Sequence, residues 1–369
     1  MQVLLSNEEK SFSKDIEIFT SKYLDKNSKI DLKTFWQELY KKQFINKNNS
    51  FLKNILLTES ICSIDPGIGL FLLTQFSCIE IINTFASKSI KEKHYEDLIP
   101  GKKITCFSIT EPEAGSDVSM IKTTAKKDDN NWIINGQKTW ASNGSISDLI
   151  IFFAQTKEHK DKTGVTCFIA ESNSKEINIS EDIPKLGVKI TPSNEIIFNS
   201  LRLSKESQIG NIGDGFKIAL STITSGRIYC AAQASGLLKG ILRESVNYST
   251  KRNQFGKAIF ENQAIQWYLA DMSKDSSACN LLLQKAAFLK DSGSEKDINE
   301  LKKHSSIAKY FCTMSAQKHS SNAVQIHGGQ GLKEESFVAK AYRDAKVLEI
   351  YEGTNEIQKI NLARELKLS

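Results

Sequence analysis

The chain has 369 residues, of which 40% are hydrophobic and 25% charged, a composition typical of a folded protein with more than one structural unit. Its net charge of +6 comes from scattered lysines, because arginine is scarce and occurs only as Arg202, Arg227, Arg243, Arg252, Arg343 and Arg364. Nucleic-acid surfaces usually concentrate arginine in a basic stripe, so we expect no nucleic-acid partner.

The cysteines and histidines narrow the possible classes of protein further. Seven cysteines without a CxxC pair indicate reduced thiols and a cytoplasmic protein. The five histidines show no metal-ligand spacing, so we expect no metal site. The N-terminus becomes polar within a few residues, which predicts that no signal peptide is present. Residues 68–82 are strongly apolar but are interrupted by Thr74, Gln75, Ser77 and Glu80, which favours a buried helix and no membrane span.

Three regions of different pattern predict an α+β fold of three domains. Residues 1–104 alternate charged and apolar positions with helical period and end in the turn signal Pro100-Gly101. Residues 105–205 contain short apolar runs rich in strand formers, which predict a small β-barrel or sandwich. Residues 206–369 return to a helical pattern, with amphipathic helices expected at 216–250, 264–290, 301–325 and 354–366.

The dipeptide Asn135-Gly136 is the clearest turn signal of the β region. It lies between short apolar runs, and both residue types tolerate the positive φ angles of a two-residue hairpin turn. We therefore expect a β-hairpin to turn at this point.

Two segments of the β region could contact a flat ligand. Residues 110–117 (TEPEAGSD) place hydroxyls and a glycine after an apolar strand, where backbone N–H groups can bind a ring system or a phosphate. A plain turn at the strand exit is the alternative. In residues 138–144 (KTWASNG), Trp140 can stack on a flat cofactor while the Ser142 hydroxyl reaches its edge. A tryptophan in a barrel core is the alternative there.

Two segments of the helical region could contact a dinucleotide. Residues 251–256 (KRNQFG) offer a guanidinium for a pyrophosphate at Arg252 and a ring for an adenine at Phe255. A solvated helix end capped by glycine is the other reading. The glycines of residues 325–331 (QIHGGQG) permit close backbone approach, or they simply end a helix. This is not a strand-to-helix dinucleotide motif, because it follows a helix.

Residues 349–358 (EIYEGTNEIQ) contain the main candidate for proton transfer. Glu352 lies between Tyr351 and Gly353, just before a helix that Thr354 can cap. A carboxylate in an apolar cleft gains basicity by desolvation, which suits proton abstraction. Seen by itself, the residue could equally be an acid in a solvent-facing loop.

Taken in order, these segments resemble the signatures TEPxAGSD, KxWITN, RxxFG, QIxGGxG and YEGT of the acyl-CoA dehydrogenase family, over about residues 50–369. The resemblance implies a helical N-terminal domain, a central β-domain and a C-terminal four-helix bundle, assembled as a homotetramer or a dimer. It also implies an FAD-dependent α,β-dehydrogenation of an acyl thioester, from acyl-CoA to 2-enoyl-CoA, with an electron-transfer flavoprotein as acceptor.

The same resemblance assigns roles to individual residues. Glu352 matches the base that removes the α-proton while the β-hydrogen leaves as hydride to flavin N5. Family branches without a carboxylate there carry it just before the arginine of the long helix, where this chain has Gly226. The residues that match FAD contacts are Phe107, Ile109, Thr110, Gly115, Ser116, Trp140, Ala141, Ser142, Arg252, Phe255, Gln263, Gln325, Gly328, Gly329, Thr354, Asn355 and Glu356. Those that match substrate contacts are Ser116, Thr224, Arg227 and Gly353.

Two departures from the family pattern bear on the substrate. The segment at residues 41–54 is shorter than in the family and lacks a PEEYGGxG-like loop. In addition, Thr224 stands where the family usually has an aspartate. Both lie where the thioester carrier is expected to enter, as in shorter relatives that oxidise acyl groups on an acyl or peptidyl carrier protein. A third reading is a flavin scaffold without dehydrogenase activity, or a flavin monooxygenase. Glu352 disfavours this reading, because neither needs an α-proton base.

Overall fold

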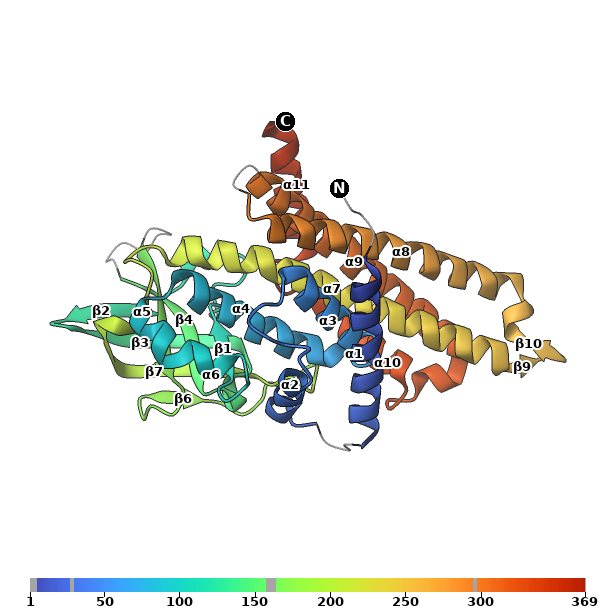
Figure 1. The fold of residues 1–369 in the computed structure, drawn as a ribbon, viewed down its shortest axis with the longest axis horizontal. Coiled ribbons are helices and arrows are strands. Elements are labelled where there is room, and N and C mark those ends of the chain that lie inside the picture. Colours follow the sequence, from blue (N-terminus) through green and yellow to red (C-terminus); the bar gives the residue numbers. More distant parts are fainter. Residues whose placement is uncertain (1–4, 27–29, 157–163, 295–296, 369) are drawn as a thin grey trace.

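The computed structural model describes residues 5–26, 30–156, 164–294 and 297–368. The chain runs from a helical layer through a β-sheet to a bundle of long helices, and the helix α7 (Gly215–Lys251) reaches from the sheet to the far end of the bundle (Figure 1). The order helical, β, helical is the one that the sequence predicts.

The N-terminal helices surround one apolar helix. They are α1 (Asn7–Lys26), α2 (Leu32–Lys41), α3 (Phe51–Cys62), α4 (Gly69–Phe85), α5 (Lys88–Ile90), a π-helical turn (Lys91–Tyr95) and α6 (Glu96–Leu98). The helical stretch Pro66–Phe85 is apolar and long enough to cross a membrane, but 78% of it is buried inside the protein. It therefore packs as the central helix of the N-terminal core, as predicted for residues 68–82.

The central domain is a mixed sheet built from β1 (Thr105–Ser108), β2 (Thr124–Asp128), β3 (Asn131–Ser142), β4 (Leu149–Gln155), β5 (Val165–Glu171), β6 (Ile177–Ile179), β7 (Ser193–Ser204) and β8 (Gln208–Ile209). The strand order is β6-β7-β3-β1-β4-β5-β8. Both β1 and β2 pair with β3 and with β4, so these four strands close a ring. Phe152, Phe168 and Phe198 pack together in its core.

The predicted hairpin turn at Asn135-Gly136 is wrong. Both residues lie inside β3, opposite a bulge in β7: β3 advances two residues from Ile134 to Gly136 while β7 advances three, from Leu201 to Phe198. Gly136 has φ +152°, and a Cβ atom there would lie 2.6 Å from the Cα atom of Thr123. The glycine serves close backbone packing. The chain reverses instead between β2 and β3, at residues 129–130.

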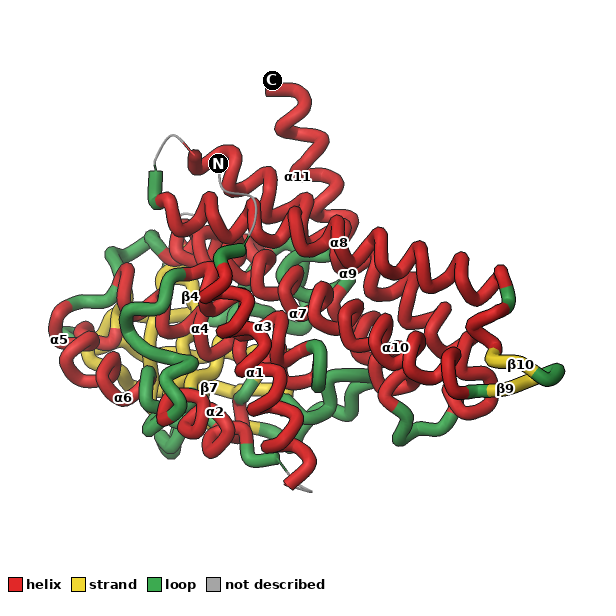
Figure 2. Tube along the Cα trace, turned by 45° about the vertical axis from the view of Figure 1, so that its right-hand side comes forward, coloured by secondary structure: helices red, strands yellow, loops and turns green. Residues whose placement is uncertain are grey.

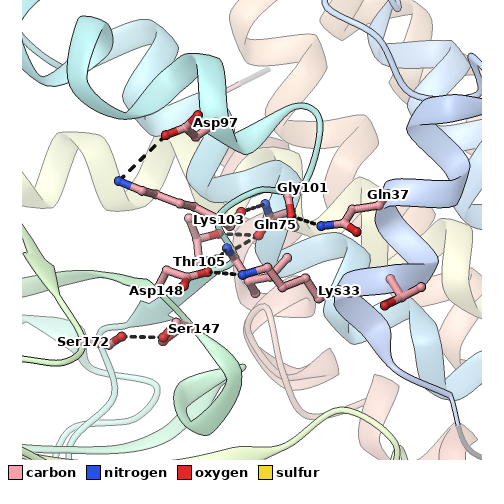
Figure 3. A network of polar contacts seen from close by, with 12 residues as sticks. Lys33, Gln37, Gln75, Asp97, Gly101, Lys103, Thr105, Ser147, Asp148 and Ser172 are labelled. Carbon is pink, nitrogen blue, oxygen red and sulfur yellow. Dashed lines mark hydrogen bonds and ion pairs between the residues drawn. The ribbon is translucent and has the colours of Figure 1, made fainter.

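A polar network docks the first strand onto the N-terminal helices (Figure 3). The Oε1 atom of Gln75, on α4, accepts hydrogen bonds from the backbone N–H and the hydroxyl of Thr105 at 2.9 and 2.8 Å. Asp148 accepts hydrogen bonds from Lys33 of α2 at 3.0 Å and from the Ile104 N–H at 2.8 Å. These contacts fix the direction of β1, which carries Phe107 toward the helical bundle.

The C-terminal bundle contains α7, α8 (Gln263–Ser292), α9 (Ile298–His327), α10 (Phe337–Leu348) and α11 (Asn355–Leu368). Helices α7, α8 and α9 run side by side, α10 packs on α7 and α9, and α11 packs on α9 and projects from the bundle (Figure 2). A short hairpin of β9 (Asn253–Gln254) and β10 (Lys257–Ala258) joins α7 to α8. The four predicted helices are present. Helix α10 was not predicted from the sequence; half of its six buried residues are alanine.

Candidate active site

Glu352 lies in the loop between α10 and α11, in an unusual backbone conformation. Glu352 has φ +57° and Gly353 has φ +81°, so two consecutive residues occupy the left-handed region. A glutamate seldom adopts this conformation unless its surroundings hold it there. The loop is closed by a hydrogen bond from the Asn355 N–H to the Glu349 carbonyl at 3.0 Å. The Thr354 hydroxyl accepts the Ile357 N–H at 3.3 Å and caps α11, as predicted.

Side chains on both sides fix the loop in place. The Tyr351 hydroxyl donates to Oε1 of Gln233, a buried residue of α7. The side chain of Gln358, on α11, donates to the Gly353 carbonyl at 2.8 Å and to the Glu352 carbonyl at 3.3 Å. The backbone of Glu352 is therefore held by two different helices.

The Glu352 carboxylate points at Gly226 on α7. A Cβ atom placed on Gly226 would lie 2.6 Å from Cδ of Glu352 and closer still to one of its oxygens. Real Cβ atoms do not approach that closely, so only glycine leaves room for the carboxylate. The two positions that the resemblance treats as alternative base positions therefore meet at one point in the structure.

The electrostatic surroundings make this carboxylate a plausible proton acceptor at neutral pH. Burial raises the pKa of Glu352 to about 7, and the positive charges of Arg227 and Lys309 oppose that rise. The Arg227 Nε atom is buried and has no hydrogen-bond partner among the described residues. The guanidinium thus keeps a free donor near the carboxylate.

The two motifs of the β-domain come together at the start of the sheet. Phe107 on β1 pairs with Ser142 on β3, and the Thr139 N–H donates to the Thr110 carbonyl at 2.9 Å. Trp140 has φ +55°, and its large side chain is 55% exposed. It therefore does not lie in the barrel core, which was the alternative reading of its motif. Neighbouring Ala141 and Ile109 are buried.

A buried ion pair joins these two motifs. The Lys138 ammonium contacts Oε1 of Glu111 at 2.7 Å and donates to the Ile109 carbonyl at 3.3 Å, and both side chains of the pair are buried. Glu111 also accepts the N–H groups of Lys122 and Thr123. The pair therefore fixes the segment around Thr110 on the strand that carries Trp140.

The glycine and serine of the first motif face open space. Gly115 and Ser116 are exposed, and a Cβ atom on Gly115 would meet nothing within 4 Å. The substrate candidate Thr224 uses its hydroxyl within α7, where it donates to the Leu220 carbonyl at 2.8 Å. Thr224 thus shows no polar contact with another element among the described residues.

Four other predicted contacts lie at the far end of the bundle. Arg252, Gly328 and Gly329 line a cavity of about 340 Å³, in which His327 stacks on Tyr248 at 4.3 Å between ring centroids. Phe255 lies between β9 and β10 and is fully exposed, and this hairpin lies at the far end of the bundle (Figure 1).

Two further predicted FAD contacts of the helical region, Gln263 and Gln325, are exposed and do not line this cavity. From Gly226 to Arg252 the chain advances 26 helical residues, or about 39 Å along α7. One chain therefore separates Arg252 from the Glu352 carboxylate, which lies against Gly226, by most of the length of α7.

Three site residues were not identified from the sequence. Gln233 and Gln358 hold the Glu352 loop, and Lys309 on α9 contacts both of its ends. Lys309 had a detectable signal, because it falls on the helix face whose other members are small and buried: Ser305, Ala308, Cys312, Thr313 and Ala316. A lysine on such a face is unusual.

Known proteins share this fold and these motifs. Residues 106–201 match the family described as Acyl-CoA dehydrogenase, middle domain, and residues 213–367 match Acyl-CoA dehydrogenase, C-terminal domain. The short-chain specific acyl-CoA dehydrogenase of Megasphaera elsdenii is 38% identical over 309 residues, 83% of this chain and 79% of that protein.

Solved structures agree with these matches. The butyryl-CoA dehydrogenase of Megasphaera elsdenii superposes with a TM-score of 0.92 and 32% identity over the whole of both chains. The prolyl acyl carrier protein oxidase AnaB superposes with a TM-score of 0.90 and 25% identity over 98% of this chain and all of the other. The chain therefore belongs to the acyl-CoA dehydrogenase family, whose members are flavin oxidoreductases that act on CH–CH groups.

Proposed function

We propose that this protein is an FAD-dependent dehydrogenase that introduces a Cα–Cβ double bond into an acyl thioester, with Glu352 removing the α-proton. One observation carries the proposal: the Glu352 carboxylate lies against Gly226, with a pKa raised by burial to about 7. Near neutral pH about half of such groups are ionised, so the base is both available and strong enough to take part in proton transfer.

The chain's residues fit an FAD group. Trp140 presents an exposed ring on a fixed backbone, and the Ser142 hydroxyl lies two residues away on the same strand. Gly115 on the β-domain has open space where a Cβ atom would lie, and so do Gly328 and Gly329 at the far end of the bundle, as close approach to a phosphate chain requires. A flavin held at Trp140 would supply the acceptor for the β-hydrogen, which would leave as hydride to N5.

The backbone at Glu352 supplies a second element of the proposed chemistry. Its N–H group has no acceptor among the described residues. Removal of the α-proton places negative charge on the thioester oxygen, and a preorganised N–H donor stabilises such a charge. Comparable donors contribute roughly 3–4 kcal/mol to the transition state.

Gln233 supports a short acyl group. It lies seven residues after Gly226 and therefore on the same face of α7. Its amide donates to the Pro66 carbonyl at 2.6 Å and accepts the Tyr351 hydroxyl. A Cβ atom on Gly69 would lie 2.5 Å from Cδ of Gln233, so this side chain fills the space between α4 and α7. Seven residues span about 10 Å along α7, so a fixed amide stands about 10 Å from Gly226 on this face and leaves a longer acyl chain little room.

The alternative substrate is an acyl group tethered to an acyl or peptidyl carrier protein. Two features favour it: Thr224 in place of the usual aspartate, with its hydroxyl bonded inside α7, and the short connection between α2 and α3. The similarity to a prolyl acyl carrier protein oxidase adds support. In this case the recognition of a second protein becomes part of the function.

The assembly and setting follow from the same reasoning. We expect a homotetramer or a dimer in which Arg252 and Phe255 of one chain serve the FAD of a second, because they lie about 39 Å along α7 from Gly226. We expect an electron-transfer flavoprotein to reoxidise the flavin. The seven cysteines are all unbridged and buried, which supports a reducing cytoplasm.

A substrate panel tests the proposal. The purified protein should be yellow, with one FAD per chain. Acyl-CoA esters of increasing length and matched acyl carrier proteins are mixed with it anaerobically, and flavin bleaching is followed. Bleaching by short acyl-CoA esters supports the leading substrate, and faster bleaching by carrier-bound groups supports the alternative. A flavin that no thioester bleaches would leave only the scaffold or the monooxygenase reading.

A further inference from the structure

One buried lysine joins the two ends of the loop that carries Glu352. Lys309 is fully buried on α9, and its ammonium donates to the Glu349 carbonyl at 3.1 Å and to Oδ1 of Asn355 at 2.8 Å. Thr313, one helical turn later, donates to the same Asn355 oxygen at 3.0 Å. Glu349 and Asn355 lie at the two ends of the loop. The contacts from α9 therefore hold these ends together.

The charge of Lys309 is not neutralised by a direct partner. Among the described residues no carboxylate lies within 4 Å of its ammonium, and both of its acceptors are neutral oxygens. A buried and unpaired ammonium is costly, and a neutral donor could make the same two hydrogen bonds. The charge itself therefore has a role that hydrogen bonding alone does not explain.

The nearby group that benefits from this charge is Glu352. Burial raises the pKa of Glu352, and the positive charges of Arg227 and, to a smaller extent, Lys309 act against that rise. The reverse also holds: burial lowers the pKa of Lys309, and ionised Glu352 acts against that fall. Each group thus favours the charged form of the other.

We infer, on the basis of the proposed function, that Lys309 is the positioning residue of the base, tying the Glu352 loop together and keeping Glu352 ionised and ready for the α-proton. The strained backbone at Glu352 and Gly353 needs such a restraint, since a base displaced by about 1 Å can lose roughly 10² in rate. Lys309 contacts neither motif assigned to the flavin on the β-domain.

The other charged and titratable groups near this pair come from every element packed around it. They are Arg227 and Cys230 on α7, Lys346 on α10, Glu349 and Tyr351 in the loop, and Glu356 and Lys359 on α11. Burial raises the pKa of Cys230 to about 12 and that of Tyr351 well above its usual range. Neither loses its proton between pH 6 and pH 8.5. A change in the rate of flavin reduction within this interval therefore reports on Glu352 and Lys309.

The test compares Lys309→Gln, which keeps a donor without charge, with Lys309→Arg, which keeps the charge. Lys318→Gln, an exposed lysine of the same helix, is the control. Removing the charge should move the ionisation of Glu352 to higher pH. Flavin reduction in Lys309→Gln should then fall roughly tenfold more at pH 6 than at pH 8.5. Lys309→Arg and Lys318→Gln should keep the wild-type pH profile. An equal loss at all pH values in Lys309→Gln would reduce Lys309 to a packing residue.

A second readout does not depend on turnover. Infrared titration of the FAD-loaded protein, with the Glu352 band assigned by its loss in Glu352→Gln, should show protonated Glu352 persisting to higher pH in Lys309→Gln. If no thioester reduces the wild-type flavin, the proposed function fails while this titration still decides the role of Lys309. An unchanged titration overturns the inference.

A third variant covers the case in which Lys309→Gln does not fold. Asn355→Leu removes the acceptor shared by Lys309 and Thr313 and leaves the charge in place. Amide hydrogen exchange in residues 349–355 should become faster, and the rate of flavin reduction should fall equally at pH 6 and pH 8.5. Wild-type exchange rates in this variant would contradict the inference.

Discussion

Gly226 and Glu352 are 126 positions apart in the chain, yet the carboxylate of one occupies the space where a side chain of the other would begin. Since α7 is rigid and buried here, a side chain at position 226 has to displace the carboxylate. Both positions therefore project into the same small volume.

The first prediction concerns Gly226→Ala. The added methyl group should push the Glu352 carboxylate aside and lower the rate of flavin reduction by roughly 10² or more, because displacing a base by about 1 Å has this effect. FAD content should stay near wild type. Stopped-flow reduction by an acyl thioester measures the loss. Gly240→Ala, on the same helix but packed against the Ser63 carbonyl and the Phe337 ring, is the matched control, with a loss of stability but not of the chemical step.

The companion test moves the carboxylate from position 352 to position 226. A glutamate at 226 needs the space that residue 352 now fills, so the informative variant is Gly226→Glu combined with Glu352→Gly. Slow but measurable turnover, above that of Glu352→Gly alone, is the expected result. Gly226→Glu with Glu352→Gln should be inactive, because the glutamine head still fills the volume.

The second prediction concerns stability and pH. Burial raises the pKa of Glu352 to about 7 from an ordinary value of 4.5, so the folded state binds this proton more tightly than the unfolded chain does. The folded state therefore loses up to about 3 kcal/mol from this group as the pH rises from 4.5 to 7. Glu352→Gln avoids that loss and should be more stable than wild type at pH 8 and about equal at pH 4.5.

Glu356→Gln should have the opposite effect on the free energy of unfolding. The start of α11 lowers the pKa of this exposed carboxylate, so its contribution is present above its ordinary pKa and is lost as the pH falls. Glu356→Gln should therefore be slightly less stable than wild type at pH 8. Denaturant unfolding in excess FAD at both pH values measures the two variants. A Glu352→Gln protein that is less stable at pH 8 would contradict the raised pKa.

The third prediction concerns the ion pair that joins the two β-domain motifs. Lys138→Met leaves Glu111 buried without its cation and should cost about 3–5 kcal/mol of unfolding free energy, with weaker FAD retention. The control is Lys122→Met, whose partner Glu113 is exposed, and there the expected cost is below about 1 kcal/mol. Similar midpoints of urea unfolding for the two variants would contradict a stabilising role for the Lys138–Glu111 ion pair.

The fourth prediction concerns assembly. Arg252→Ala should weaken FAD binding roughly ten- to hundredfold, the usual worth of a hydrogen bond to a charged group, with little change in unfolding. Arg202→Ala, which breaks an exposed pair with Asp128, should leave FAD binding unchanged. Fluorescence of released FAD measures both. Light scattering that finds a flavin-loaded monomer would contradict the shared site.

Part of this architecture could be predicted because it is encoded locally. Helix periodicity located α7, α8, α9 and α11, and the motif around Thr110 met the one around Trp140 because adjacent strands carry them. The Asn135-Gly136 signal misled because a glycine required for close packing against Thr123 looks the same in the sequence as a glycine required by a hairpin turn. Only the fold tells these two apart.

The site itself depended more on tertiary packing than on motifs. The contact between Glu352 and Gly226 arises where a loop packs on a distant helix, and no local pattern encodes it. The position of Lys309 among small residues of its helix face was a detectable signal, but only the packing of α9 under residues 349–355 shows which loop it holds.

The most direct test of the central claim is the rate of flavin reduction in Glu352→Gln. Glutamine keeps the size and the hydrogen-bonding shape of glutamate but cannot accept the α-proton, so the variant separates basicity from packing. FAD should remain bound at one per chain, and reduction by an acyl thioester should slow by at least ~10²–10⁴-fold. A Glu352→Gln protein that bleaches its flavin at close to the wild-type rate would show that Glu352 is not the base.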